Sequence, residues 1–155
     1  MKMKNTKQTQ TKTNEYLQGI NFKKFDGYEK QLIRSSLMVF EVKEDFYDYS
    51  MFILPIMRVL EHTIELSIKN YTKVKVKSLV FKDFNKPKNS DKYELNTSET
   101  GKYVKFINKA YNYYRANRHE NVHLNDLTPQ KIMSKKVAQA IVRNTLNLLR
   151  TYSQF

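Results

Sequence analysis

Hydrophobic residues recur at helical spacing over most of the chain, and this pattern predicts four main helices. The first is expected from near Asp26 to Glu44, with Asp26 as its N-cap and Glu29 three residues later, as in a capping box. The second, over residues 45–70, is apolar on most sides and therefore belongs at the centre of a bundle. Because Pro55 lies inside it, this residue should either kink the helix or mark its true first turn.

The pattern changes between the second and third helices. Residues 73–81 (KVKVKSLVF) alternate polar and apolar side chains, which predicts a short strand or one arm of a hairpin. Residues 84–94 (FNKPKNSDKYE) are typical of an exposed loop. A third helix should begin near Ser98 and run through Tyr114.

The fourth helix is predicted from its capping residues and its apolar spacing. Thr128 is the expected cap and Pro129 the first helical residue, the position that proline prefers. Its expected core face comprises Met133, Val137, Ile141, Leu148 and Tyr152.

Together these elements predict an all-α bundle of four main helices, with a short irregular or β-hairpin insertion between the second and third. The chain contains only 3 Gly and 3 Pro, too few for a β-sandwich rich in tight turns. Residues 1–14 are polar and basic with almost nothing to bury, so they are expected to be a disordered tail. Residues 15–155 are expected to be one helical domain.

Charge narrows the possible partners. The 28 Lys and Arg outnumber the 15 Asp and Glu, and a net charge of +13 attracts phosphate polymers or anionic membranes. Part of this excess can also reflect the codon usage of an AT-rich genome. The longest apolar run, Met51–Met57, is too short to span a bilayer, and no secretory signal is evident. With no Cys for disulfides, the expected location is the cytoplasm, without a membrane partner.

One face of the second helix carries a charged stripe made of Arg58, Glu61, His62, Glu65 and Lys69. Such a stripe is ordinarily a solvated surface with ion pairs, and this interpretation suffices for Glu65 and Lys69. Arg58 and Glu61 interrupt a more apolar part of the helix and are candidates to line a partly buried cleft. One turn apart, these two side chains are a natural ion pair.

A second candidate site lies near the end of the third helix. Two of the six arginines and two of the three histidines fall within residues 115–123. Arginine offers a permanently charged fork for phosphate, and histidine exchanges protons near neutral pH, which are the two abilities that metal-free RNA cleavage requires. A basic surface at a helix C-terminus explains the same residues without chemistry.

A metal site is the third possibility considered. His119 and His123 have the spacing of the two histidines in HExxH, but Glu120 lies in a polar stretch at a helix end rather than on an apolar helix. No phosphate-binding Gly-rich loop is present. We therefore predict neither a metal site nor a cofactor.

The segment Arg118-x4-His123, with His119 after the arginine, resembles the R-polar-x3-H signature of HEPN domains. Together with YNYYRANRHENVH (residues 111–123) and ILPIMRVLE (residues 53–61), it resembles the catalytic HEPN domain of RNase LS-type toxins of bacterial toxin–antitoxin systems. In that family an R-x-x-E pair on the central helix accompanies the motif. Arg58 and Glu61 match this pair.

The resemblance implies a metal-independent endoribonuclease that cleaves single-stranded RNA, including mRNA, to 2′,3′-cyclic phosphate and 5′-hydroxyl ends. It implies catalytic roles for Arg118, His123, Arg58 and Glu61, so Arg58 and Glu61 are expected within interaction distance of Arg118 or His123. It also implies a homodimer in which two copies of the motif share one cleft, and a possible antitoxin protein as partner. The candidate RNA-binding residues around the motif are Tyr114, Arg115, His119 and Asn121.

Two other functions fit parts of the sequence. A non-catalytic helical module that binds nucleic acid or protein accounts for the charge and the bundle without chemistry. A membrane-surface protein fits less well, because the basic tail has no apolar residues to insert. RNA degradation in EDTA, lost on His123→Ala, distinguishes the enzyme from the binding module.

Overall fold

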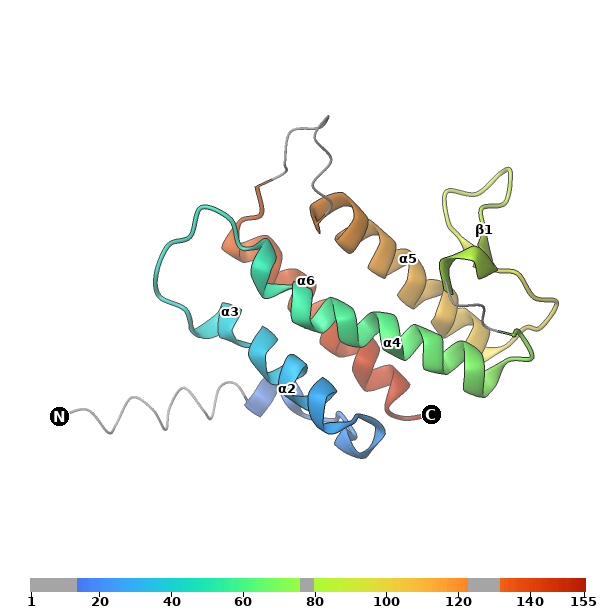
Figure 1. Ribbon diagram of the computed structural model, residues 1–155, viewed down its shortest axis with the longest axis horizontal. Coiled ribbons are helices and arrows are strands. Elements are labelled where there is room, and N and C mark those ends of the chain that lie inside the picture. Colours follow the sequence, from blue (N-terminus) through green and yellow to red (C-terminus); the bar gives the residue numbers. More distant parts are fainter. Residues whose placement is uncertain (1–13, 76–79, 123–131) are drawn as a thin grey trace.

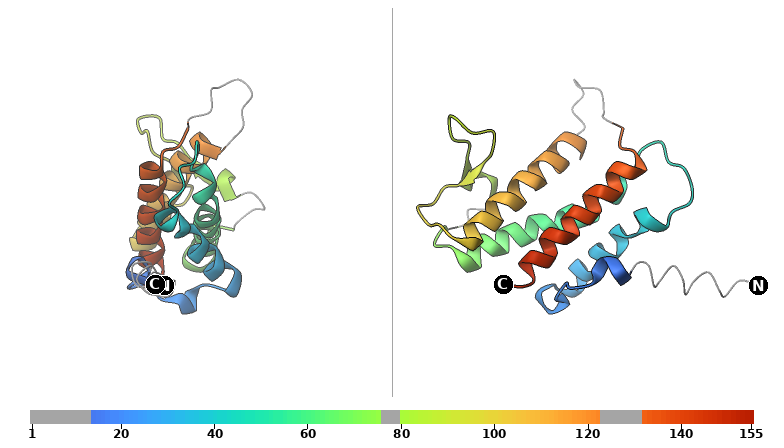
Figure 2. Two further views of the ribbon diagram at one scale, coloured as in Figure 1. Left: turned by 90° about the vertical axis from the view of Figure 1, so that its left-hand side faces the viewer. Right: turned by 180° about the vertical axis from the view of Figure 1, so that it is seen from behind.

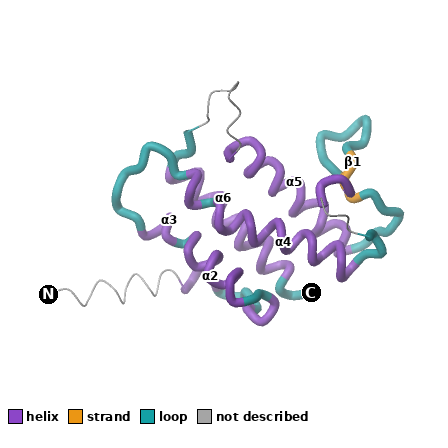
Figure 3. Tube along the Cα trace, in the orientation of Figure 1, coloured by secondary structure: helices purple, strands orange, loops and turns teal. Residues whose placement is uncertain are grey.

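The computed structural model describes residues 14–75, 80–122 and 132–155, without the side chains of residues 80–81 and 119–122. Its described part is mostly helical, with one very short pair of strands (Figure 1, Figure 3). The all-α bundle predicted from the sequence is therefore confirmed.

Helix α4 (Leu54–Tyr71) lies at the centre, in contact with α2 (Gly27–Ser36), α5 (Lys102–Val122) and α6 (Lys135–Tyr152) (Figure 1). It is buried on several sides, as the apolar pattern of this stretch predicts. Pro55 stands in the first turn of α4, where its missing N–H and fixed φ do no harm, so of the two interpretations the second is confirmed. The buried residues of α4 are Ile56, Met57, Val59, Leu60, Thr63, Ile64, Ser67 and Ile68.

The first predicted helix is shorter than expected. The capping box is confirmed, because Asp26 accepts from the Glu29 backbone N–H at 2.7 Å and Glu29 accepts from that of Asp26 at 2.9 Å. The helix stops at Ser36, however, and α3 (Met38–Glu41) follows as a separate turn. The hydroxyls of Ser35 and Ser36 donate to carbonyls three residues back, and such bonds compete with the regular helical ladder.

The start of the second predicted helix is also wrong, since residues 45–49 are not helical and a 3-10 turn, η2 (Ser50–Phe52), precedes α4. The Asp48 carboxylate accepts from the Ser50 hydroxyl at 2.6 Å and from the backbone N–H groups of Ser50 and Met133, each at 3.0 Å. These bonds tie the segment to the chain ahead of α6. Tertiary contacts thus replace the local helix.

The described parts of the predicted strand, residues 73–75 and 80–81, form no strand. Within residues 73–81, positions 76–79 lie outside the described residues, and the 3-10 turn η3 (Val80–Asp83) follows. The strands among the described residues are β1 (Phe84–Asn85) and β2 (Glu94–Leu95), an antiparallel pair inside the predicted loop. The insertion itself does lie between the second and third main helices, as expected.

Both later helices begin after their predicted starts. Helix α5 begins at Lys102 rather than near Ser98, directly after Gly101, whose φ of +121° favours glycine. Helix α6 begins at Lys135, where the Ser134 side chain accepts from Val137 N–H. The predicted cap Thr128 and Pro129 lie outside the described residues.

The predicted core face of the last helix is right except at one position. Ile141, Leu148 and Tyr152 are buried on α6, and Met133 is buried just before the helix begins. Val137 is 48% exposed, because Ala138 takes the inward position in the first turn. The views of Figure 2 show α6 and α5 side by side, with α4 behind them in the right-hand view.

Candidate functional site

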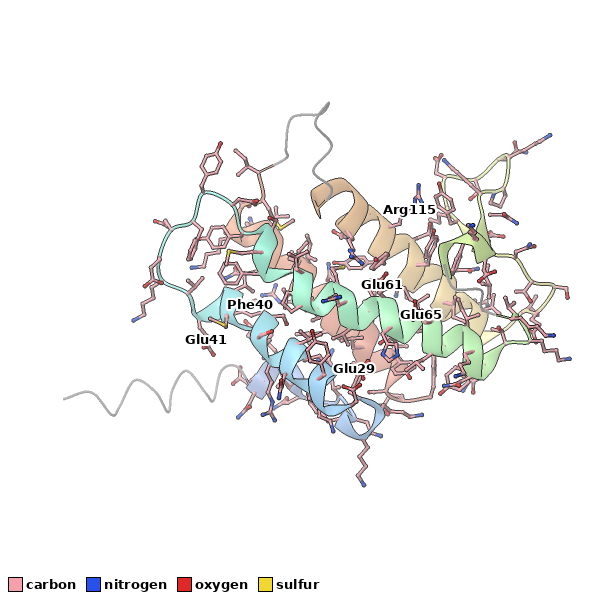
Figure 4. The ribbon with its side chains drawn as sticks, in the orientation of Figure 1. Glu29, Phe40, Glu41, Glu61, Glu65 and Arg115 are labelled. Atoms are coloured by element: carbon pink, nitrogen blue, oxygen red, sulfur yellow. The ribbon has the colours of Figure 1, made fainter. Side chains whose placement is uncertain are left out.

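A charged cluster joins α4 and α5 near the end of α5. Arg118 donates through Nη1 to the Glu61 carboxylate of α4 and to the Tyr114 hydroxyl of α5. Glu61 points from α4 toward α5 (Figure 4). The side chains of Arg118 and Glu61 are 29% and 27% exposed, so the pair is partly shielded from water yet open on one side.

The sequence places these groups together through helical spacing. Tyr114 and Arg118 are four residues apart and share a face of α5, and the Arg118 guanidinium carbon lies 5.5 Å from the centre of the Tyr114 ring. Tyr114 is only 1% exposed, so its ring is held by the core packing beneath the Arg118 guanidinium. Neither contact uses Nε or Nη2 of Arg118. Since guanidinium carries five N–H donors, these two contacts leave further donors on the fork that suit a phosphate oxygen.

Electrostatics favour a permanently charged arginine here. Burial lowers the pKa of Arg118, but the neighbouring oxygens of Tyr114 and Glu61 outweigh burial and leave that pKa above its ordinary value. Burial raises the pKa of the Tyr114 hydroxyl well above its ordinary value, and the Glu61 carboxylate raises it further. Tyr114 is therefore a neutral hydrogen-bonding group at physiological pH and not a general base.

The expected contact between the central-helix pair and the motif is present for one residue of the pair. Glu61 reaches Arg118, whereas Arg58 is exposed on α4 and makes no ion pair with any residue of the described ranges. The predicted Arg58–Glu61 pair is therefore wrong. Glu61 pairs across the helix interface because α4 presents it directly to α5, one turn beyond Arg58.

Arg115 lies in a different setting on α5. Its guanidinium carbon stands 4.3 Å from the centre of the Tyr93 ring, beside the strand β2, in cation–π geometry. Arg115 also lowers the pKa of the Tyr111 hydroxyl, although burial dominates and leaves that pKa raised. The sequence does not identify Tyr93 as a site residue, because it belongs to a stretch interpreted as an exposed loop and nothing local marks it.

The remaining predicted site residues cannot be placed at the level of side chains. His123 lies outside the described residues, and His119 and Asn121 belong to the last turn of α5, where the backbone alone is described. Arg118 itself stands five residues before His123.

His62, a member of the charged stripe on α4, has a structural partner. Its Nδ1 lies 2.7 Å from Oε1 of Glu29, a side chain that is only 8% exposed and also completes the capping box of α2. Within the part of the chain that the structure describes, no three His, Asp or Glu side chains are grouped to hold a metal ion. No helix among the described residues is long and apolar enough to cross a membrane.

Fold and cluster together define an all-α bundle domain with a partly buried Arg–Glu–Tyr site between its central helix and the helix that carries the motif. Residues 5–125 match the family model described as "RNase LS, bacterial toxin DBD domain". The chain belongs to this family.

A solved structure has the same fold. The Escherichia coli toxin LsoA, in its crystal structure in complex with the T4 phage antitoxin Dmd, superimposes with a TM-score of 0.75 over 94% of this chain. The two sequences are 18% identical, and the match spans 59% of the LsoA chain. Comparison with curated protein sequences gives no match.

Proposed function

We propose that this domain is a metal-independent endoribonuclease of the toxin kind, which cleaves single-stranded RNA to 2′,3′-cyclic phosphate and 5′-hydroxyl ends. One observation carries the proposal: Arg118 is held between Glu61 and Tyr114, five residues before His123. The membership of an RNase LS toxin family supports the same activity.

In the proposed reaction a base removes the proton of the RNA 2′-hydroxyl, and the 2′-oxygen then attacks the adjacent phosphorus. The bond to the 5′-oxygen breaks, and an acid returns a proton to that leaving oxygen. His123 supplies proton transfer, and Arg118 stabilises the negative charge that develops on the phosphoryl oxygens. No metal ion or cofactor takes part, because these two side chains supply both the proton transfer and the charge stabilisation.

A homodimer completes the proposed site. A single His123 cannot be base and acid at once, whereas two copies related by a twofold axis provide both, with two arginines for phosphate. Glu61 and Tyr114 are positioning residues that act through Arg118. Arg58 is proposed to line the cleft of the homodimer from its position on α4.

The residues Arg115, His119 and Asn121 are proposed to contact the RNA strand on either side of the cleaved bond. An antitoxin protein is the proposed regulator, because the LsoA structure is that of a toxin bound to one. A protein that covers Arg118 would block access to the phosphate.

The decisive experiment measures cleavage of a labelled single-stranded RNA in EDTA. His123→Ala should reduce the rate about 10²–10⁴-fold, the usual contribution of acid–base catalysis. Arg118→Lys should reduce it about 10²-fold or more, because lysine keeps the charge but loses the fork. Arg34→Lys, at an exposed position on α2, is the matched control and should leave the rate unchanged.

Two results would contradict the enzyme. Wild-type protein silenced by EDTA would require a metal, and His123→Ala protein as active as wild type would remove the proposed acid and base. RNA binding without any cleavage would leave a non-catalytic binding module of the same fold.

A further inference from the structure

A basic groove lies between α5, α6 and the hairpin, on a side of α5 other than the one facing Glu61. Its volume is about 830 Å³, and it is open to solvent. Its charged side chains are Lys92, Lys105, Lys109 and Glu94, a clear excess of positive charge. The right-hand view of Figure 2 shows α5 and α6 side by side, with the hairpin near the first half of α5.

We propose that this groove binds single-stranded RNA at a distance from the cleaved bond, as a subsite of the proposed ribonuclease. The inference deepens the proposed function, since it assigns a surface for the substrate strand. The groove combines lysines with exposed amides and two tyrosine rings, and each group suits a different part of a nucleotide.

The lysines suit the phosphates. Lys105 and Lys109 are exposed one turn apart on α5, and Lys92 is exposed across the groove on the hairpin. Cations that neutralise phosphates release counterions, which gives affinity for a strand of any sequence. A groove lined by three lysines and one glutamate therefore attracts a polyanion.

The asparagine amides of the groove match the hydrogen-bonding groups of nucleobases better than those of an acidic protein. Asn144 and Asn147 are exposed on the α6 wall, and an amide offers donors and an acceptor together, as base edges do. The Oδ1 of Asn147 accepts from Arg150, so Asn147 presents its NH2 donors to the groove. Acidic side chains need donors alone. Tyr93 and Tyr113 also line the groove, and partly exposed tyrosine rings are surfaces on which unpaired bases stack.

The groove is connected to the candidate catalytic site through α5. Arg115 stacks on the Tyr93 ring at the edge of the groove (Arg115 is labelled in Figure 4), and Arg118 follows three residues later. With a rise of about 1.5 Å per residue, Lys109 lies about 14 Å along the helix from Arg118. A strand of several nucleotides can therefore occupy the groove while its cleaved bond lies near the end of α5.

The test measures binding without cleavage. The probe is a fluorescein-labelled, 2′-O-methylated single-stranded RNA of about ten nucleotides, which has no 2′-hydroxyl to attack, and fluorescence anisotropy is recorded in EDTA. Lys105→Ala/Lys109→Ala should weaken binding about tenfold. The slope of log K against log salt should become less steep by about 1.4, or about 0.7 for each lost phosphate contact.

Matched variants separate the groove from the overall charge. Lys23→Ala/Lys43→Ala removes the same charge at exposed positions outside the groove and should change neither affinity nor slope. Asn144→Ala should weaken binding without changing the slope, because it removes no charge. Alanine favours helices, so the changes on α5 and α6 should preserve the fold.

The proposal is overturned if the groove variants bind RNA as wild type does, or if the control pair loses as much affinity as the groove pair. It is also overturned if the groove variants lose binding of an oligoglutamate peptide but not of RNA, since the groove would then serve an acidic protein. Loss of RNA binding in the groove variants, together with a wild type that never cleaves, would refute the ribonuclease and leave the groove assigned. Cleavage that depends on His123, with normal binding by the groove variants, would refute the groove alone.

Discussion

Glu61→Gln is the sharpest test of the Arg118 cluster, because it removes one charge and almost no volume. Exposed ion pairs contribute about 0.2–1 kcal/mol, and breaking a fully buried pair costs about 3–5 kcal/mol. The two side chains here are 27% and 29% exposed, between these limits. We therefore expect Glu61→Gln to lower the free energy of unfolding by about 1–2 kcal/mol.

Glu65→Gln is the matched control, since Glu65 lies one turn further along α4 and is also partly exposed (Figure 4). It should change stability by no more than about 0.5 kcal/mol. For a chain of this size, the loss in Glu61→Gln corresponds to a fall in melting temperature of about 2–8 °C. Urea unfolding monitored by circular dichroism measures the difference, and the m-value should be the same as that of wild type.

A double-mutant cycle assigns the loss to the pair itself. Glu61→Gln, Arg118→Gln and the combined variant should show a coupling of about 1 kcal/mol, because either single change already breaks the contact. In RNA cleavage, Glu61→Gln should lower kcat with little change in KM, since Arg118 loses alignment rather than charge. Equal destabilisation by Glu61→Gln and Glu65→Gln, or a coupling near zero, would refute the role given to the pair.

Two further predictions concern contacts away from this cluster. Burial raises the pKa of Asp48, but hydrogen bonds from Ser50 and Met133 outweigh burial and leave it below its ordinary value of 3.8. Asp48→Asn should therefore lower the free energy of unfolding by about 1 kcal/mol at pH 7, as measured by urea titration. The difference from wild type should persist above pH 3.8 and vanish as the pH falls through the folded-state pKa of Asp48. His62→Ala should cost about 1–2 kcal/mol because it leaves the buried Glu29 without its cross-helix partner, whereas the exposed Lys69→Ala control should cost less than about 0.5 kcal/mol in the same titration.

Features set within one helical turn could be predicted from the sequence. The capping box of Asp26 and Glu29 needs only residues three apart, and the place of Pro55 follows from its missing N–H. The apolar spacing of α4 likewise identifies a central helix without reference to its neighbours. These signals are local, and the fold class followed from them.

Features decided by distant contacts could not be predicted in this way. Asp48 binds the backbone N–H of Met133, 85 residues away, and no pattern around Asp48 reveals that partner. The contact of Glu61 with Arg118 was expected through family resemblance rather than spacing, because the two are 57 residues apart. The burial of Tyr114 beneath Arg118 depends on the packing of α4 against α5, so the sequence marks it only as an aromatic residue near the motif.

The attachment of the hairpin to α5 has a consequence for how the insertion can vary. Asn108 and Asn112 accept from the backbone N–H groups of Leu95 and Tyr93, each at 2.8 Å. Four helical residues rise about 6 Å and two strand residues about 6.8 Å, so the spacing of the two amides matches that of alternate strand residues. The spacing of the two asparagines on α5 thus fixes the alignment of residues 93–95 along the helix. Moving either asparagine by one position would lose the alignment, whereas the connecting residues 86–92 can change in length without disturbing it.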